Sequence, residues 1–175
     1  LIKNKLNAGL KVYVEYSNEV WNGGTFPQTV AYTAAQGSAI GLTTPEDYFR
    51  SVQYAAYRSI EIWELFEAVW GNQSNRVINV LGGQSTNDWI MENRVWPVIF
   101  DSPTSNPNNR KPEALSIAPY FGGNGWNGAA NNVFDLLRQD INGPRPGGGD
   151  GRLTDVQQWH ALAQSKGVPS LIAYE

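Results

Sequence analysis

Four short segments rich in β-branched and aromatic residues occur along the 175-residue chain, and segments with helical spacing of apolar residues lie between them. Such alternation is typical of βαβ units, in which a helix connects two parallel strands. We therefore predict an α/β fold with a sheet of four parallel strands. The predicted strands are residues 12–17, 77–81, 115–120 and 169–175.

Helices are predicted between these strands from capping residues and from apolar residues three or four positions apart. The longest is expected to begin with Thr44 as its hydroxyl cap and to end before Gly71. Gly37 is expected to end the preceding helix, and Thr154 to cap the last one. The predicted helices are residues 27–36, 44–70, 87–97, 130–140 and 154–167.

The two faces of the predicted strands differ, because side chains alternate with a period of two. The bulky, apolar set is Val12, Val14, Tyr16, Ile78, Val80, Leu115, Ile117, Ile172 and Tyr174. The smaller, more polar set is Tyr13, Glu15, Ser17, Glu19, Asn79, Leu81, Ser116, Ala118, Tyr120, Leu171, Ala173 and Glu175. A doubly wound sheet is apolar on both faces, whereas helices cover only the outer face of a barrel. The asymmetry favours a barrel.

A complete (β/α)8 barrel takes roughly 250 residues, and four strands are half of its sheet. We therefore interpret residues 1–175 as a fragment of a single barrel domain, with the remaining strands outside this chain. The expected architecture is a partial (β/α)8 TIM barrel, in which helices cover the outer face of four parallel strands. The isolated fragment is expected to lack a complete site and to be inactive.

The chain has no cysteine and a single histidine, His160. This composition excludes a thiol nucleophile, a disulfide framework and a zinc site of the usual Cys/His type, and we expect no metal and no cofactor. A Ser-His-Asp triad is not expected either, because His160 lies within a predicted helix, far from any strand-end serine. Carboxylates are the remaining candidates for acid–base chemistry.

Charge and hydropathy restrict the partners of the chain. The formal net charge is -3 and there is no run of Lys or Arg, so nucleic acid is not an expected partner. No apolar segment approaches the roughly 18 residues of a membrane span, so no membrane partner is expected. The 7 Trp and 8 Tyr residues supply flat apolar faces that suit a core and also suit stacking on sugar rings.

Two glutamates come at the carboxyl ends of predicted strands, where α/β proteins bind ligands. Glu19 follows the strand over 12–17, and Glu175 ends the last strand. The face pattern places both on the inner side of the sheet, together with Tyr120. Glu15, which points inward below Glu19, is expected to be a hydrogen-bonded structural acid.

The order of these features resembles the clan A glycoside hydrolases, which are retaining enzymes on the (β/α)8 barrel, and in particular the cellulase-like endoglycosidases. Residues 12–22, with their Asn-Glu pair, resemble the fourth barrel strand, and residues 171–175 resemble the seventh. Residues 77–84 and 115–120 would be the fifth and sixth. The resemblance implies a secreted or periplasmic enzyme that hydrolyses O-glycosidic bonds in a β-glucan-like or hemicellulose substrate.

The resemblance also implies roles for individual residues. Retaining hydrolysis needs a proton donor on the leaving oxygen and a carboxylate nucleophile roughly 5 to 5.5 Å from it. By the resemblance, Glu19 is the acid/base and Glu175 is the nucleophile. Asn18 would bind the sugar 2-hydroxyl, and Tyr120 would donate a hydrogen bond to Glu175. The candidate sugar platforms are Trp21, Trp89 and Trp126.

Two alternatives remain at this point. A carbohydrate-binding relative could retain the barrel without catalysis, because binding needs aromatic rings and hydrogen bonds but no pair of carboxylates. A doubly wound domain that binds a nucleotide is disfavoured, because no Gly-x-Gly-x-x-Gly follows a predicted strand. The glycine run at 147–149 follows prolines and is interpreted as a loop.

Overall fold

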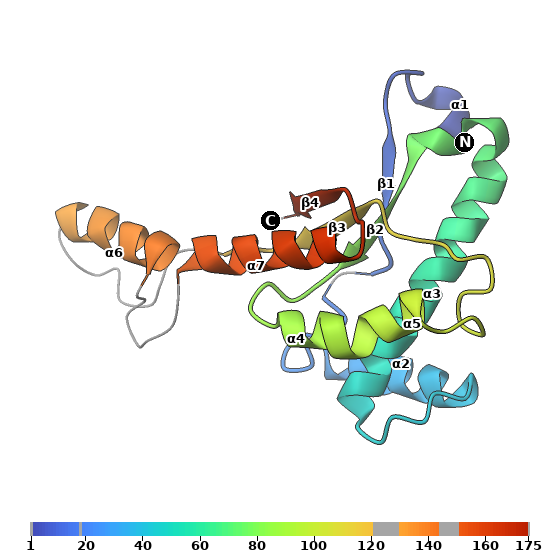
Figure 1. Cartoon of the computed structure of the whole chain (residues 1–175), viewed down its shortest axis with the longest axis horizontal. Helices are drawn as coiled ribbons and strands as arrows, with labels where there is room; N and C mark the ends of the chain where they lie inside the picture. Colours follow the sequence, from blue (N-terminus) through green and yellow to red (C-terminus); the bar gives the residue numbers. More distant parts are fainter. Residues whose placement is uncertain (1, 18, 121–129, 144–150, 175) are drawn as a thin grey trace.

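The computed structural model describes residues 2–17, 19–120, 130–143 and 151–174. Its sheet holds four strands in the order β1-β2-β3-β4, and each neighbouring pair is parallel (Figure 1). The α/β fold with four parallel strands in chain order is therefore confirmed. The strands are β1 (Val12–Val14), β2 (Val77–Gly82), β3 (Ala114–Ile117) and β4 (Ser170–Ala173).

Helices occur in all five predicted places. Three short helical elements follow one another without a break over 88–100, so the helix predicted over 87–97 continues beyond Pro97. Figure 1 shows α6 at the far end of the molecule from α2 and α3. The helices are α1 (Ile2–Lys5), α2 (Pro27–Ala39), α3 (Asp47–Trp70), η1 (Gly71–Arg76), α4 (Asp88–Ile90), η2 (Met91–Val95), α5 (Trp96–Phe100), α6 (Ala130–Asn142) and α7 (Arg152–Ser165).

The prediction that Gly37 ends the helix after β1 is wrong, because Gly37 lies inside α2. A Cβ atom at this position would come within 2.9 Å of the Arg50 side chain on α3. The missing side chain therefore allows α2 and α3 to pack closely, and the helix continues to Ala39. Gly71, by contrast, ends α3 as predicted, with the left-handed φ of 54° that favours glycine.

The two predicted hydroxyl caps are also wrong. Thr44 donates its hydroxyl to Gln53 Oε1 at 2.6 Å, and α3 begins only at Asp47. Thr154 lies within the first turn of α7, which begins at Arg152. Ser, Thr and Asp side chains have local partners other than a helix terminus, and sequence alone does not distinguish them.

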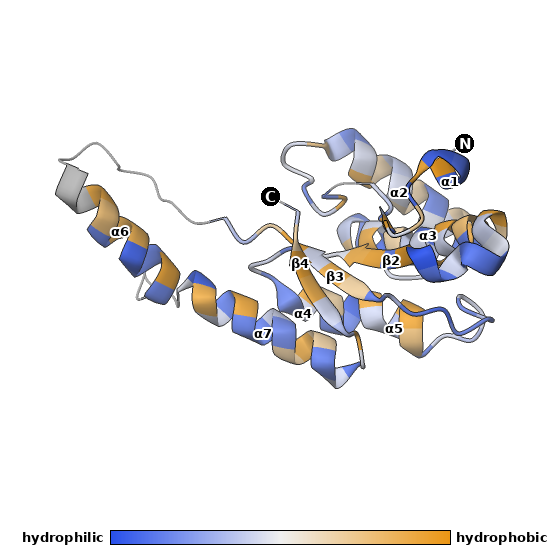
Figure 2. Ribbon diagram, turned by 90° about the horizontal axis from the view of Figure 1, so that it is seen from above, coloured by the Kyte–Doolittle hydropathy of each residue, from blue (hydrophilic) through white to orange (hydrophobic). Residues whose placement is uncertain are grey.

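The main core lies between one face of the sheet and helices α3, α5 and α7. Trp63, Trp96 and Trp159 come from these three helices and are almost completely buried in one cluster with Val14 and Leu115. The Trp63 indole N–H also donates to the Val14 carbonyl at 3.3 Å. Figure 2 shows apolar residues concentrated on the strands, with mixed faces on α6 and α7. Burial of aromatic surface therefore fixes the helices on this face.

The predicted assignment of residues to the two faces is wrong for β2 and β4. Val14 pairs with Asn79 and Leu115 pairs with Leu171, and paired residues of parallel strands share a face. Both faces of β2 and β4 carry apolar residues. The alternation of side chains therefore did not reveal which residues of these strands face the helices. The face that packs on the helices holds Val12, Val14, Val77, Asn79, Leu81, Leu115, Ile117, Leu171 and Ala173.

On the opposite face of the sheet, the residues near the carboxyl ends of β2 and β3 are small or polar. The members of this face are Tyr13, Ile78, Val80, Gly82, Ala114, Ser116, Ser170 and Ile172. Continued alternation beyond β4 places Tyr174 on this face, and its N–H still donates to the Ile117 carbonyl at 3.2 Å. The end of β4 is therefore held against β3 up to Tyr174.

Gly83 provides a test of how tightly the core is packed at the carboxyl end of β2. A Cβ atom there would overlap the ring of Trp159 and reach 3.0 Å from Met91 Cε. We expect Gly83→Ala to reduce the free energy of unfolding by about 1 to 3 kcal/mol, as overpacking does. The matched control is Gly24→Ala, because no atom lies within 4 Å of a Cβ there. Urea unfolding followed by circular dichroism measures both, and equal stabilities would contradict the described packing.

Candidate functional site

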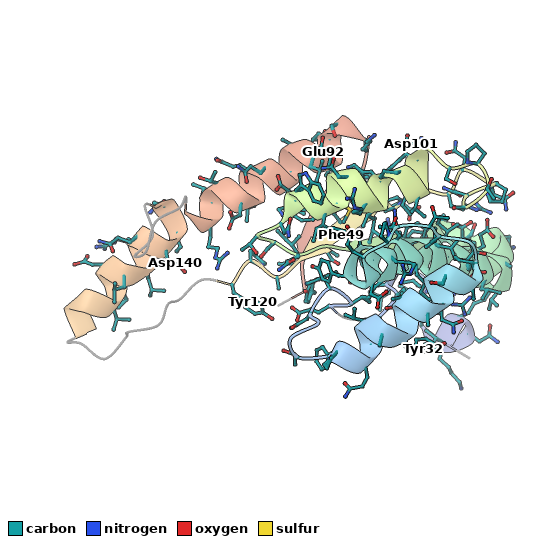
Figure 3. The ribbon with its side chains drawn as sticks, turned by 90° about the horizontal axis from the view of Figure 1, so that it is seen from below. Tyr32, Phe49, Glu92, Asp101, Tyr120 and Asp140 are labelled. Atoms are coloured by element: carbon teal, nitrogen blue, oxygen red, sulfur yellow. The ribbon has the colours of Figure 1, made fainter. Side chains whose placement is uncertain are left out.

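Loops that follow β1, β2 and β3, together with the end of β4 and the start of α7, surround a cleft of about 490 Å3. This volume is in the range of small-molecule sites, roughly 300 to 1,000 Å3. Three residues predicted from the sequence meet there: Glu19, Trp21 and Tyr120. Tyr120 is 51% exposed at the rim (Figure 3). The lining residues are Glu19, Trp21, Asn22, Gly23, Gly24, Gln84, Ser85, Thr86, Ala118, Tyr120, Arg152 and Tyr174.

The loop after β1 brings Glu19 to the cleft through an unusual backbone conformation. Ser17 and Glu19 have φ of 61° and 48°, in the left-handed region that residues other than glycine rarely adopt. Asn22 N–H donates to the Glu19 carbonyl at 2.8 Å and closes a turn after it. Because such conformations cost free energy and concentrate at functional sites, this loop is a candidate for a functional role.

The Glu19 carboxylate receives one hydrogen bond on each oxygen. Asn22 Nδ2 donates to Oε2 at 2.9 Å, and the Tyr174 hydroxyl donates to Oε1 at 3.2 Å. The orientation of the Asn22 amide is determined by Thr25, whose N–H donates to Asn22 Oδ1 at 3.2 Å. Glu19 is thus held between the β1–α2 loop and the end of β4.

Tyr174 is a residue of the site that sequence reasoning missed, because the phase of β4 was assigned to the wrong face. Burial raises the pKa of Tyr174, and the neighbouring Glu19 carboxylate and, more weakly, Glu15 raise it further. The phenol therefore keeps its proton at neutral pH and is available as a donor to Glu19. The correct register of β4 against β3 is the signal that would have identified it.

Glu15 lies below the cleft, beside an apolar cavity lined by Trp21, Trp159 and other residues. Its Oε2 accepts a hydrogen bond from Ser116 Oγ at 2.9 Å, which confirms the expected hydrogen-bonded acid. Burial raises the pKa of Glu15, and the Ser116 hydrogen bond opposes this effect. Gly82 leaves the room for this carboxylate, because a Cβ atom at that position would overlap Glu15 Oε1.

The remaining predicted residues are not part of the described cleft. Trp89 lies on α4, where its ring centroid is 5.8 Å from that of Phe49 and Arg94 lies over both rings. It is not among the residues that line the cleft. Asn18, Trp126 and Glu175 lie outside the described residues, so their places and the Glu19–Glu175 separation stay predictions.

Comparison of the chain with protein-family models gives no match. Curated proteins and solved structures give none either.

Among the residues that the structure describes, no group of three or more His, Cys, Asp or Glu side chains is arranged to hold a metal ion. No helix within the same residues has the length and hydropathy to cross a membrane. The cleft and its side chains are therefore the features of the described structure that point to a function.

The burial of Glu15 has a consequence for stability. Because its pKa is raised above 4.5, the native state binds this proton more tightly than the unfolded chain, and the associated stability is lost as the pH rises through the raised pKa. We expect Glu15→Gln to gain stability relative to the wild type between about pH 4 and about pH 7. Urea unfolding at both pH values measures this. Glu92→Gln, at an exposed position on η2 (Figure 3), is the control, and identical pH dependence of all three proteins would contradict the burial of Glu15.

Proposed function

We propose that this cleft hydrolyses O-glycosidic bonds in a polysaccharide or oligosaccharide, β-glucan-like or hemicellulose, with retention of configuration. The observation that carries the proposal is the position of the Glu19 carboxylate. It lines the cleft and accepts a hydrogen bond from Tyr174, the residue that precedes Glu175. This contact places the end of β4 beside Glu19, whereas the entry of the Glu175 carboxylate into the cleft, which a retaining mechanism requires, is inferred from the family resemblance alone. The role of Glu175 remains a proposal, because this residue lies outside the described residues.

The proposed reaction has two steps. In the first, protonated Glu19 transfers its proton to the leaving oxygen while the bond from that oxygen to the anomeric carbon breaks, and the Glu175 carboxylate forms a bond to this carbon. In the second, Glu19 removes a proton from water, the water oxygen bonds to the anomeric carbon, and the bond to Glu175 breaks. Glu19 is thus returned to its protonated form.

Substrate binding in this proposal uses the aromatic residues of the cleft. Trp21 and Tyr120 present rings with polar groups, a combination suited to stacking on a pyranose and to hydrogen bonding with its hydroxyls. Gln84 and Arg152 add side-chain donors on other parts of the wall. Asn18 and Trp126 would complete the set of binding residues.

The proposed fold beyond the described sheet is half of a (β/α)8 barrel. Strands β1 to β4 would be its fourth to seventh strands, in agreement with their parallel pairing in chain order. The face opposite the helices, which includes Ser116 and Tyr174 near the strand ends, would be the interior of the barrel. The cleft would then lie at the carboxyl ends of the strands, where barrel enzymes have their active sites.

Substitution of Glu19 in the intact barrel enzyme tests the acid/base role of this residue. Glu19→Ala should slow hydrolysis of unactivated oligosaccharides by about 10²- to 10⁴-fold, because their leaving oxygen needs a proton. Activated aryl glycosides, which need no proton donor, should lose far less in the step that releases the aryl group. Initial rates on both kinds of substrate measure the ratio, and equal losses would show that Glu19 is not the acid.

Substitution of Glu175 tests the nucleophile. Glu175→Ala should abolish hydrolysis of both kinds of substrate, because no glycosyl-enzyme forms, and added azide should restore part of the activity on aryl glycosides by attacking in its place. Product analysis and rates with and without azide measure this. If the intact wild-type enzyme binds oligosaccharides but hydrolyses none, the non-catalytic carbohydrate-binding alternative replaces the proposal.

A further inference from the structure

The two hydrogen bonds on Glu19 are chemically different, and the difference concerns its proton. The Asn22 NH2 group donates to Oε2 and cannot accept, and its orientation is set by the bond from Thr25 N–H to Asn22 Oδ1. A proton placed on Oε2 would therefore face another donor. The phenol of Tyr174 next to Oε1 differs, because a hydroxyl both donates and accepts.

We propose that Tyr174 is a positioning residue that directs the acidic proton of Glu19 to Oε1 and holds that oxygen in the cleft. This inference rests on the proposed function, in which Glu19 acts as acid and then as base. When Glu19 is ionised, the Tyr174 hydroxyl donates to Oε1. When Glu19 is protonated, the hydroxyl turns and accepts the proton of Oε1 until the glycosidic oxygen of the substrate replaces it.

The surroundings of Tyr174 support this role. The groups that face it from neighbouring elements are Glu19 on the β1–α2 loop, Glu15 after β1, and Tyr120 and Arg152 across the cleft. Burial and the two carboxylates raise the pKa of Tyr174, so the phenol keeps its proton at neutral pH. It therefore changes from donor to acceptor by rotation alone.

The position of Tyr174 in the chain adds a mechanical role. Its N–H is bonded to the Ile117 carbonyl on β3, so its backbone belongs to the sheet, while its hydroxyl reaches Glu19 on a loop with left-handed backbone. One side chain therefore ties the loop that carries the proposed acid to the strand that leads into the proposed nucleophile. Loss of the hydroxyl should loosen the acid while leaving the ring in place.

The kinetic test is the Tyr174→Phe substitution in the intact barrel enzyme. We expect kcat on unactivated oligosaccharides to fall by about 10-fold or more, since misplacement of a catalytic group by a fraction of an ångström has effects of this size. KM should change by less than about twofold, and aryl glycosides should lose less than oligosaccharides. Tyr13→Phe, at a 59% exposed position on β1, should change neither. Equal losses on both kinds of substrate would overturn the role of Tyr174.

A second measurement does not depend on activity. In the protein labelled with 13C at tyrosine Cζ, the Tyr174 resonance, assigned with Tyr174→Phe, should shift across a pH series as its hydroxyl changes between donor and acceptor toward Glu19. The shift should vanish in Glu19→Gln and persist in Glu15→Gln, and Tyr13 should show none. Absence of the shift, or its persistence in Glu19→Gln, would overturn the inference. Inactivity of the intact wild-type enzyme on every glycoside would instead overturn the proposed function, so the two failures are distinguishable.

Discussion

Parallel pairing of the four strands is the constraint on which the rest of the structure depends. It aligns β1, β2, β3 and β4 so that all their carboxyl ends lie at one edge of the sheet, and the residues beyond those ends share one cleft. Glu19 and Tyr174 are 155 positions apart in the sequence and still form a hydrogen bond. Burial of Trp63, Trp96 and Trp159 fixes helices α3, α5 and α7 on one face. The cleft is therefore a product of strand direction and of helix packing together.

The Glu19 carboxylate is held by neutral donors rather than by an ion pair. Asn22 and Tyr174 are both uncharged, and neither neutralises the carboxylate as an arginine would. Arg152, which lines the same cleft, is instead paired with Asp155 through Nη1 at 3.1 Å. The contacts of the Glu19 side chain among the described residues are thus hydrogen bonds from uncharged groups.

The sequence predicted the parallel sheet and the helix positions, because periodicity and strand alternation are local properties. It also placed Glu19, Trp21 and Tyr120 near strand ends, and the structure brings these three into one cleft. The phase of β4 and the role of Tyr174 depend on register against β3, which is a long-range property. Gly37 was misassigned for a related reason, since its neighbour Arg50 belongs to another helix, whereas Thr44 bonds to Gln53 within the helix that it was predicted to cap. Local patterns thus predict elements better than contacts between elements.

Strands β1 and β4 form the two edges of the described sheet, and they are only three and four residues long. An edge strand presents backbone N–H and C=O groups to any further strand that approaches it. Since every connection in this sheet is parallel, a strand added at either edge in the same direction would bring its following loop to the rim that already holds Glu19 and Tyr120. Extension of the sheet would therefore enlarge the existing binding surface instead of creating a separate one. The number of strands in the sheet would thus set how many loops contact a bound ligand.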